Sequence, residues 1–124
     1  MPTYQGGCHC GAVRYEVTKA EAPTSLIDCN CSVCTKKGIL HLGAEHDEFK
    51  ITQGQATLKL YQFNTATAKH WFCGNCGIHV YGVPRSNPER LSVNARTLDS
   101  FHALLPSVTL TPFDGINHPK DRQA

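Results

Sequence analysis

Apolar and polar residues alternate along several short stretches of the 124-residue chain, which is the pattern of a β-strand with one buried face. The clearest stretch is Gly11–Thr18, in which Val13, Tyr15 and Val17 occupy one face. The same pattern predicts further strands at Thr24–Asp28, Ile39–Gly43, Phe49–Thr52, Thr57–Phe63, Ala68–Phe72, Ile78–Val83 and Leu91–Ala95. Because no amphipathic helices separate these strands, we expect antiparallel pairing in two small sheets and a mainly β fold.

Helix and turn signals are sparse. Asp99–Leu105 is the segment expected to form a short helix. Turns are expected at Gly54, within Pro84–Pro88 and at Asp114-Gly115. No linker-like composition divides the chain, so we expect one domain over residues 1–124, with its core at about 6–118. No apolar run approaches the roughly 18 residues that span a membrane, and we expect no membrane association.

The seven cysteines fall into three clusters. They are Cys8 and Cys10, then Cys29, Cys31 and Cys34, then Cys73 and Cys76. Cysteines at such spacings are typical of zinc sites, which use four ligands when structural and three when one position stays open for chemistry. The outer two pairs supply one complete set of four, and the central triplet is one ligand short. We therefore expect two Zn²⁺ ions per chain, one of them with an open position.

Disulfides and a redox pair are the two rival uses of these thiols. An odd number of cysteines leaves one unpaired, and the first residues have neither the basic nor the apolar region of an export signal. The Cys73–Cys76 spacing also occurs in thioredoxin-like redox motifs, where it lowers a thiol pKa. Such a motif needs a helix after it, whereas Ile78–Tyr81 alternates like a strand. Two zinc sites are therefore favoured, and both rivals stay open.

The predicted strands place the outer cysteine pairs in turns. Cys8 and Cys10 precede the first predicted strand, and the second pair lies between two later strands. Gly11 and Gly77 follow the two pairs and allow a tight backbone whose amides turn toward sulfur. Zinc shared by pairs so distant in sequence closes a large loop and should stabilise the fold strongly. The sulfurs of the central triplet, in contrast, are expected to converge from a single loop.

The formal net charge of +2 gives no support for a nucleic-acid partner. Ionising the seven thiols and binding two Zn²⁺ ions would change it to −1. The basic residues are scattered, and no basic stripe interleaved with aromatic residues occurs. These features argue against nucleic-acid binding. Unpaired thiolates indicate a reducing compartment, so we expect the protein in the cytoplasm or in the nucleus.

Other zinc enzymes have sequence signatures that this chain lacks. A nucleobase deaminase needs a glutamate two residues after its first zinc ligand and a Pro-Cys-x-x-Cys motif downstream. Neither Cys29 nor Cys31 has that glutamate, and no proline precedes a Cys-x-x-Cys pair. The His-Glu-x-x-His motif of zinc proteases is absent as well. A zinc-stabilised binding module without catalysis stays open as the non-enzyme alternative.

Several motifs, in this order, resemble those of one enzyme family. They are G-G-C-H-C-G-A-V-R-Y-E-V, D-C-N-C-S-V-C-T-K-K-G, F-N-T, A-K-H-W-F-C-G-N-C-G-I-H, P-R-S-N-P and F-D-G-I-N-H. From about Gly6 to His118 the chain resembles the glutathione-dependent formaldehyde-activating enzyme family, and within it the chain is especially similar to the centromere protein V subgroup. The resemblance implies a β-tent zinc fold, which is a small antiparallel β structure with little helix.

The resemblance also implies a role for each cysteine cluster. The structural zinc would be held by Cys8, Cys10, Cys73 and Cys76. The catalytic zinc would be held by Cys29, Cys31 and Cys34. The family's named reaction joins glutathione to formaldehyde and gives S-hydroxymethylglutathione, formally a carbon–sulfur lyase working in reverse. We therefore expect a zinc-dependent carbon–sulfur lyase whose partner is a small thiol such as glutathione.

Charge arguments favour the thiol as the ligand at the open zinc position. Three thiolates on Zn²⁺ leave a net charge of −1, which makes the metal a poorer Lewis acid that acidifies bound water less. A fourth, exchangeable thiolate stays nucleophilic and can attack the formaldehyde carbon, and polarisation of the carbonyl by zinc is the second choice. His70 and His79 could shuttle protons or serve as structural side chains. His9 lies between two cysteines and is expected to be exposed.

Glutathione carries two carboxylates and therefore needs cationic partners. Lys36 and Lys37 directly follow the cysteine triplet, and Arg85 lies in the Pro84–Pro88 segment. These three residues are the candidates for binding the substrate, with arginine best suited to bidentate carboxylate contacts. Plain surface charge is the alternative explanation for each of them.

Overall fold

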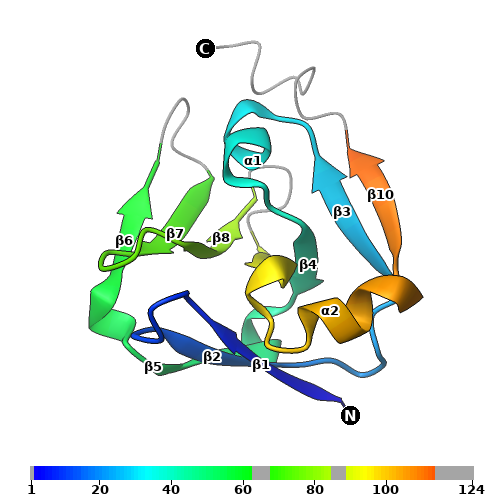
Figure 1. Cartoon of the computed structure of the whole chain (residues 1–124), viewed down its shortest axis with the longest axis horizontal. Helices are drawn as coiled ribbons and strands as arrows, with labels where there is room; N and C mark the ends of the chain where they lie inside the picture. The colour runs from blue at the N-terminus through cyan, green and yellow to red at the C-terminus, as the bar shows by residue number, and fades with distance from the viewer. Residues whose placement is uncertain (1, 63–67, 85–88, 114–124) are drawn as a thin grey trace.

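The computed structural model describes residues 2–62, 68–84 and 89–113, which form ten strands and two short α-helices (Figure 1). The strands are β1 (Thr3–Gly7), β2 (Arg14–Thr18), β3 (Ser25–Cys29), β4 (His41–Ala44), β5 (Phe49–Gln53), β6 (Leu58–Tyr61), β7 (Lys69–Cys73), β8 (His79–Val83), β9 (Leu91–Asn94) and β10 (Thr109–Phe113). The helices are α1 (Ser32–Lys37) and α2 (Phe101–Leu104), with 3-10 turns at His46–Glu48, Gln55–Thr57, Ala95–Thr97 and Leu105–Ser107. The prediction of a mainly β fold with little helix is confirmed.

The strands form two sheets. One has three antiparallel strands in the order β1-β2-β5. The other has seven strands in the order β10-β3-β4-β9-β8-β7-β6. All pairs in the larger sheet are antiparallel except β10 with β3, which run parallel. The prediction of two antiparallel sheets is confirmed apart from that one pair.

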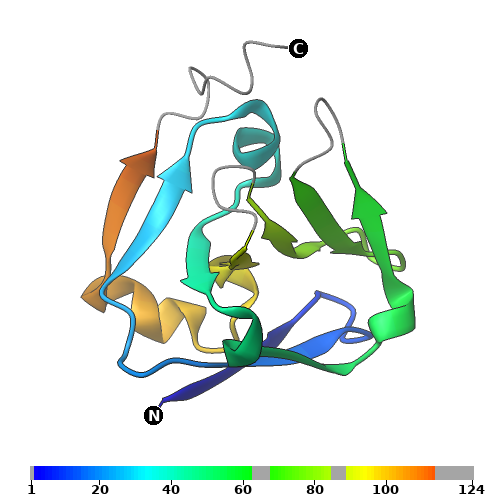
Figure 2. The same cartoon turned by 180° about the vertical axis from the view of Figure 1, so that it is seen from behind.

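The larger sheet bends around the molecule. In Figures 1 and 2, β3 and β10 lie on one side, β6 and β7 lie on the opposite side, and β4 lies between them. Helix α1 lies between these two sides at one end of the molecule, and the three-stranded sheet lies at the other end. This arrangement brings the turn after β1 close to the turn after β7, although the two are far apart in sequence.

The alternation along each strand decides which of its faces is buried. Val13, Tyr15 and Val17 are at most 1% exposed, as the sequence pattern predicts. Leu42 in β4 and Val93 in β9, from the larger sheet, belong to the same hydrophobic core as Tyr15 in β2 of the smaller sheet. Both sheets therefore contribute to this core. Because side chains alternate along a strand, the other face of the larger sheet carries a different set of residues.

Two strands lie where the sequence pattern gave no signal. β1 ends in Gly6 and Gly7, and glycine is uncommon in strands. A Cβ on Gly6 would lie 2.5 Å from the Tyr15 hydroxyl oxygen, so close packing excludes a side chain there. β10 contains Pro112, which normally argues against a strand, but a proline is tolerated because β10 is at the edge of its sheet.

Helix α1 corrects the expectation that the central cysteines lie in a single loop. Cys29 ends β3, Cys31 is the N-cap residue of α1, and Cys34 lies within the helix. Gly38 ends the helix with a φ of 67°, and its N–H donates to the Cys34 carbonyl oxygen at 2.9 Å. A strand end and a helical turn therefore hold the three sulfurs.

The remaining local predictions fall partly outside the described residues. The helix expected at Asp99–Leu105 is confirmed as α2 and the 3-10 turn that follows it. Gly54 occupies a turn with a φ of 80°, as expected. Residues 85–88 and the Asp114-Gly115 turn lie outside the described residues. Within the part of the chain that the structure describes, no helix is long and apolar enough to cross a membrane.

Candidate metal centres

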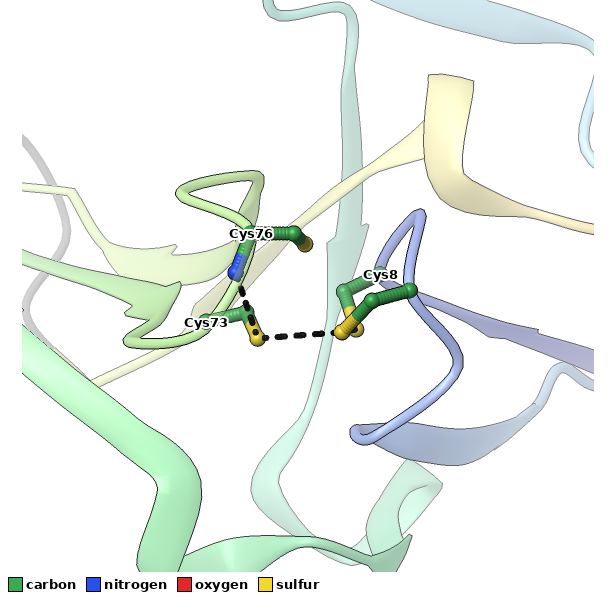
Figure 3. Close-up of side chains that lie close together, drawn as sticks. Cys8, Cys73 and Cys76 are labelled. Atoms are coloured by element: carbon green, nitrogen blue, oxygen red, sulfur yellow. Dashed lines mark hydrogen bonds between the residues drawn. The ribbon is translucent and has the colours of Figure 1, made fainter.

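The outer two cysteine pairs meet in space. Cys8 and Cys10 lie in the turn between β1 and β2, Cys73 ends β7, and Cys76 lies in the turn before β8. Their four sulfur atoms lie within 4.8 Å of one another. Figure 3 shows Cys8 on one turn facing Cys73 and Cys76 on the other. Four thiol groups this close can hold one metal ion, which would tie the three-stranded sheet to the seven-stranded sheet.

N–H groups point at the sulfurs of this cluster. The backbone N–H of Val13 donates to Cys8 Sγ at 3.3 Å. The backbone N–H of Asn75 donates to Cys73 Sγ at 3.3 Å, and its side-chain amide donates to Cys10 Sγ at 3.2 Å. Such hydrogen bonds stabilise thiolates, and the thiolate is the form of cysteine that binds metals.

The turn geometry and the pKa values of Cys10 and Cys76 agree with a thiolate cluster, whereas burial raises the pKa of Cys73 to about 11, so that thiol ionises only when a cation shares its charge. Gly11 and Gly77 both have a φ of 81°, the left-handed conformation that glycine permits. The side-chain amide of Asn75 is the main reason why the pKa of Cys10 lies below its ordinary value. Burial opposes ionisation of Cys76, but hydrogen bonds, led by that with the Cys10 backbone, outweigh it and lower the pKa of Cys76 to about 6.

The central triplet forms a second cluster. The sulfurs of Cys29, Cys31 and Cys34 lie within 4.8 Å of one another. Hydrogen bonding with Cys29 and then Cys31, together with burial, raises the pKa of the Cys34 thiol. Thiolates packed this closely repel one another unless a cation shares their charge, so the donor set suits a soft divalent metal ion. This cluster can hold a metal ion with one donor fewer than the four-cysteine cluster.

Disulfide bonds and a thioredoxin-like redox pair, the two alternative uses of the thiols, gain no support from the fold. All seven cysteines are free thiols. The Cys8 and Cys10 sulfurs are 3.5 Å apart, well beyond the roughly 2.05 Å of a disulfide bond. Strand β8, and not a helix, follows Cys76, so the βαβ setting of a thioredoxin-like redox motif is missing there.

A cavity of about 240 Å³ opens beside the three-cysteine cluster. Besides the three cysteines, its lining includes His41, Gly43, His70, Arg90, Ser92 and Phe113. None of the four outer cysteines belongs to this lining. A small molecule in the cavity can therefore reach the sulfurs of the triplet.

The register of the larger sheet explains which residues reach the cavity. Ile27 is paired with His41, and Gly43 is paired with Ser92. Paired residues share one face of a sheet, so these four positions are on the cavity side. Leu42, between His41 and Gly43, points the other way and joins the core. The cavity is thus built on the face of β4 that is opposite the face packed into the core.

His41 is a candidate functional residue that the sequence pattern did not single out. Its Nε2 lies 3.1 Å from Cys34 Sγ, and its Nδ1 is hydrogen-bonded to Ser92 Oγ. Burial lowers the pKa of His41, so the imidazole is neutral near pH 7. The alternation Leu40-His41-Leu42 contained the signal, because a histidine between two core leucines of a strand points away from the core.

The two histidines that were candidate proton shuttles lie in different surroundings. His70 lines the cavity. His79 is 5% exposed, and burial, with a smaller effect of the Lys37 charge, lowers its pKa to about 3. Lys37 Nζ lies 3.5 Å from His79 Nδ1 and close to the rings of Tyr61 and Phe72. His79 is therefore a neutral buried side chain, whereas His70 faces the candidate site.

The predicted substrate-binding cations do not line the cavity where the structure describes them. Lys36 is exposed on α1, and Lys37 is turned toward two aromatic rings. Arg85 lies outside the described residues. Arg90, which nothing in the sequence pattern singled out, belongs to the lining instead. His9 is exposed, as expected.

Two small sheets, a set of four cysteines that joins them and a set of three cysteines beside a cavity define a class of protein: a small β protein with two candidate metal centres. Residues 3–111 match the family described as glutathione-dependent formaldehyde-activating enzyme. The chain belongs to this family, as the resemblance of its motifs implies. The family is named for an enzyme.

Two relatives show how far the similarity extends. A Rhodobacter sphaeroides protein with a crystal structure is 40% identical and has a TM-score of 0.76, over 86% of this chain and 99% of that chain. A Halomonas elongata protein, provisionally described as a glutathione-dependent formaldehyde-activating enzyme, is 28% identical over 105 residues. That match covers 77% of this chain and 66% of the relative, so the chain spans slightly less than two thirds of the relative's length.

Proposed function

We propose that this chain is a zinc-dependent carbon–sulfur lyase that joins a small thiol to formaldehyde or a related electrophile. The observation that carries the proposal is the difference between the two cysteine clusters. Four sulfurs form one set, whereas the other set has three sulfurs on the wall of a cavity. Four ligands complete a structural zinc site, and three leave a position for a substrate. The family name supports glutathione and formaldehyde as the substrates.

Each cluster has its own part in this proposal. The structural zinc is bound by Cys8, Cys10, Cys73 and Cys76. The catalytic zinc is bound by Cys29, Cys31 and Cys34. With both sites filled, the chain carries two Zn²⁺ ions, and a reducing compartment such as the cytoplasm keeps all seven thiols available as ligands.

The proposed reaction adds the S–H bond of the thiol across the carbonyl group. A sulfur–carbon bond forms, the carbonyl π bond breaks, and the thiol proton ends on the carbonyl oxygen. Cys29, Cys31 and Cys34 would hold the zinc ion, which would supply an exchangeable position and favour the thiolate form of the substrate thiol. His41 holds a proton at Nε2 beside Cys34, and Ser92 orients the imidazole ring through Nδ1.

A zinc-stabilised binding module without catalysis is the alternative, since membership of an enzyme family does not guarantee the named activity. The deciding experiment is exchange NMR on the zinc-loaded full chain with glutathione and ¹³C-formaldehyde. We expect exchange between free formaldehyde and its glutathione adduct to accelerate in proportion to protein concentration. Cys34→Ser should abolish the acceleration, and His102→Ala, which removes an exposed histidine on α2, should preserve it. Unchanged exchange rates with glutathione and with simpler thiols would leave only the binding module.

A further inference from the structure

Arg90 brings a permanent positive charge to the wall of the cavity beside the three cysteines. It directly precedes β9, the strand that carries Ser92, and its side chain is 39% exposed. From its placement we infer that Arg90 recognises a carboxylate on the thiol substrate. This inference rests on the proposed thiol chemistry and adds to it the residue that selects the substrate.

Glu45 holds the guanidinium group of Arg90 from one side. Arg90 Nε lies 3.0 Å from Glu45 Oε1. The backbone N–H of Glu45 donates to Glu48 Oε1 at 2.8 Å, and Lys19 Nζ donates to the same oxygen at 2.9 Å. Glu45 is therefore tied to the fold. The Glu45 carboxylate draws the guanidinium group toward it by charge, while Arg90 Nε itself is buried and has no partner in hydrogen-bond geometry within the described residues.

Gly43 leaves room for the other side of the guanidinium group. A Cβ on Gly43 would lie 3.4 Å from Arg90 Nη2 and 3.5 Å from Nη1. The two terminal nitrogens of Arg90 therefore lie over the backbone of β4 at Gly43. Gly43 and Arg90 both line the cavity. Within residues 2–62, 68–84 and 89–113, Glu45 is the only acidic side chain within ion-pair distance of Arg90, and its contact is with Nε. Nη1 and Nη2 stay available to a ligand as a pair of donors.

A carboxylate fits such a pair of donors best. A guanidinium group binds a carboxylate through two parallel N–H···O bonds, which a neutral carbonyl or amide cannot match. Ile27, Val33 and Phe113 add apolar surface to the same cavity, and an ion pair is stronger where water is partly excluded. The expected ligand is a thiol whose carboxylate reaches Arg90 while its sulfur reaches the three-cysteine cluster. Glutathione and smaller mercapto acids both belong to this class.

A simple surface ion pair with Glu45 is the competing explanation for Arg90. Calorimetry on the zinc-loaded full chain with two matched thiols, 3-mercaptopropionate and its methyl ester, decides between the two. The wild type should bind the acid about 10- to 100-fold more tightly than the ester, the range expected for charged hydrogen bonds. Arg90→Gln should remove most of this preference. Arg90→Lys should keep only part of this preference, because an ammonium group cannot make the bidentate contact with a carboxylate.

The matched control is Lys50→Gln, which removes an exposed cation on β5 outside the cavity lining and should leave the preference unchanged. Equal binding of acid and ester by the wild type, or a preference that survives in Arg90→Gln, overturns the assignment of Arg90 and leaves the thiol chemistry standing. An acid that binds no more tightly than propionate, which lacks the thiol, overturns the proposed thiol chemistry instead. Loss of propionate binding in Arg90→Gln would still support Arg90 as the carboxylate site.

Discussion

At the scale of single residues, His41 is the candidate for moving a proton beside the three-cysteine cluster. Its two ring nitrogens face Cys34 Sγ and Ser92 Oγ. A neutral imidazole carries one N–H, so only one of these two contacts can receive a hydrogen from the ring at a time. When Cys34 is a thiolate, Nε2 must carry that hydrogen, and the Ser92 hydroxyl then donates to Nδ1.

We expect His41→Ala to lower kcat/KM for thiol addition by about 100-fold or more, the usual contribution of a positioned acid–base group. Steady-state kinetics measures this, with His102→Ala as the control for loss of a histidine elsewhere. Elemental analysis should find the zinc content unchanged, because His41 belongs to neither sulfur cluster. Unchanged kcat/KM would rule out a proton role for His41, and loss of zinc would mark it as a metal ligand.

The residues that could be predicted are those that stand in a recognisable local spacing. The triplet is local, and each outer pair is local as well, so the count of four ligands joined the two pairs although they are 63 positions apart. His41 and Arg90 could not be assigned in this way. The role of His41 depends on the register that pairs β4 with β9, and that of Arg90 depends on Glu45 and on the missing side chain of Gly43.

At the scale of elements, α1 carries one wall of the candidate site with only six residues. An isolated helix of this length is not stable in water, so its ends matter. Gly38 ends it in the left-handed conformation and donates to the Cys34 carbonyl oxygen. A Cβ on Gly38 would meet nothing within 4 Å. The effect of a side chain there is therefore conformational and not steric.

Gly38→Ala should lower the free energy of unfolding by about 1 kcal/mol, because alanine is disfavoured in the left-handed conformation. Gly38→Asn is the matched variant and should lower it less, since asparagine adopts that conformation more readily. Urea unfolding of the zinc-loaded proteins compares the three chains. Equal losses for alanine and asparagine would mean that the helix end does not depend on the backbone conformation of residue 38.

Most strands could be predicted because they alternate cleanly, and the exceptions have physical reasons. β1 is made possible by packing of Gly6 against Tyr15, which no local pattern encodes. β10 pairs in parallel with β3, more than 80 positions earlier, and it contains a proline that only an edge strand tolerates. Long-range pairing and edge position are properties of the assembled sheet, so neither could be read from its own residues.

At the scale of the whole molecule, the four-cysteine cluster connects the two sheets. Cys10 and Cys73 are 63 positions apart, so a metal ion that binds both closes a long loop. The three-cysteine cluster spans only Cys29 to Cys34, and a metal ion there closes almost none. We therefore propose different roles for the two clusters: the four-cysteine cluster holds the fold together, and the three-cysteine cluster carries the chemistry.

Zinc content and thermal unfolding of two matched variants, Cys73→Ser and Cys34→Ser, test this division most directly. A structural zinc contributes on the order of 10 kcal/mol of apparent binding free energy, which is comparable with the stability of a whole domain. Cys73→Ser should therefore be insoluble or grossly destabilised. Cys34→Ser should fold, keep the zinc of the four-cysteine cluster and lose the other. A Cys34→Ser chain as unstable as Cys73→Ser, or one that keeps both zinc ions, would contradict the account.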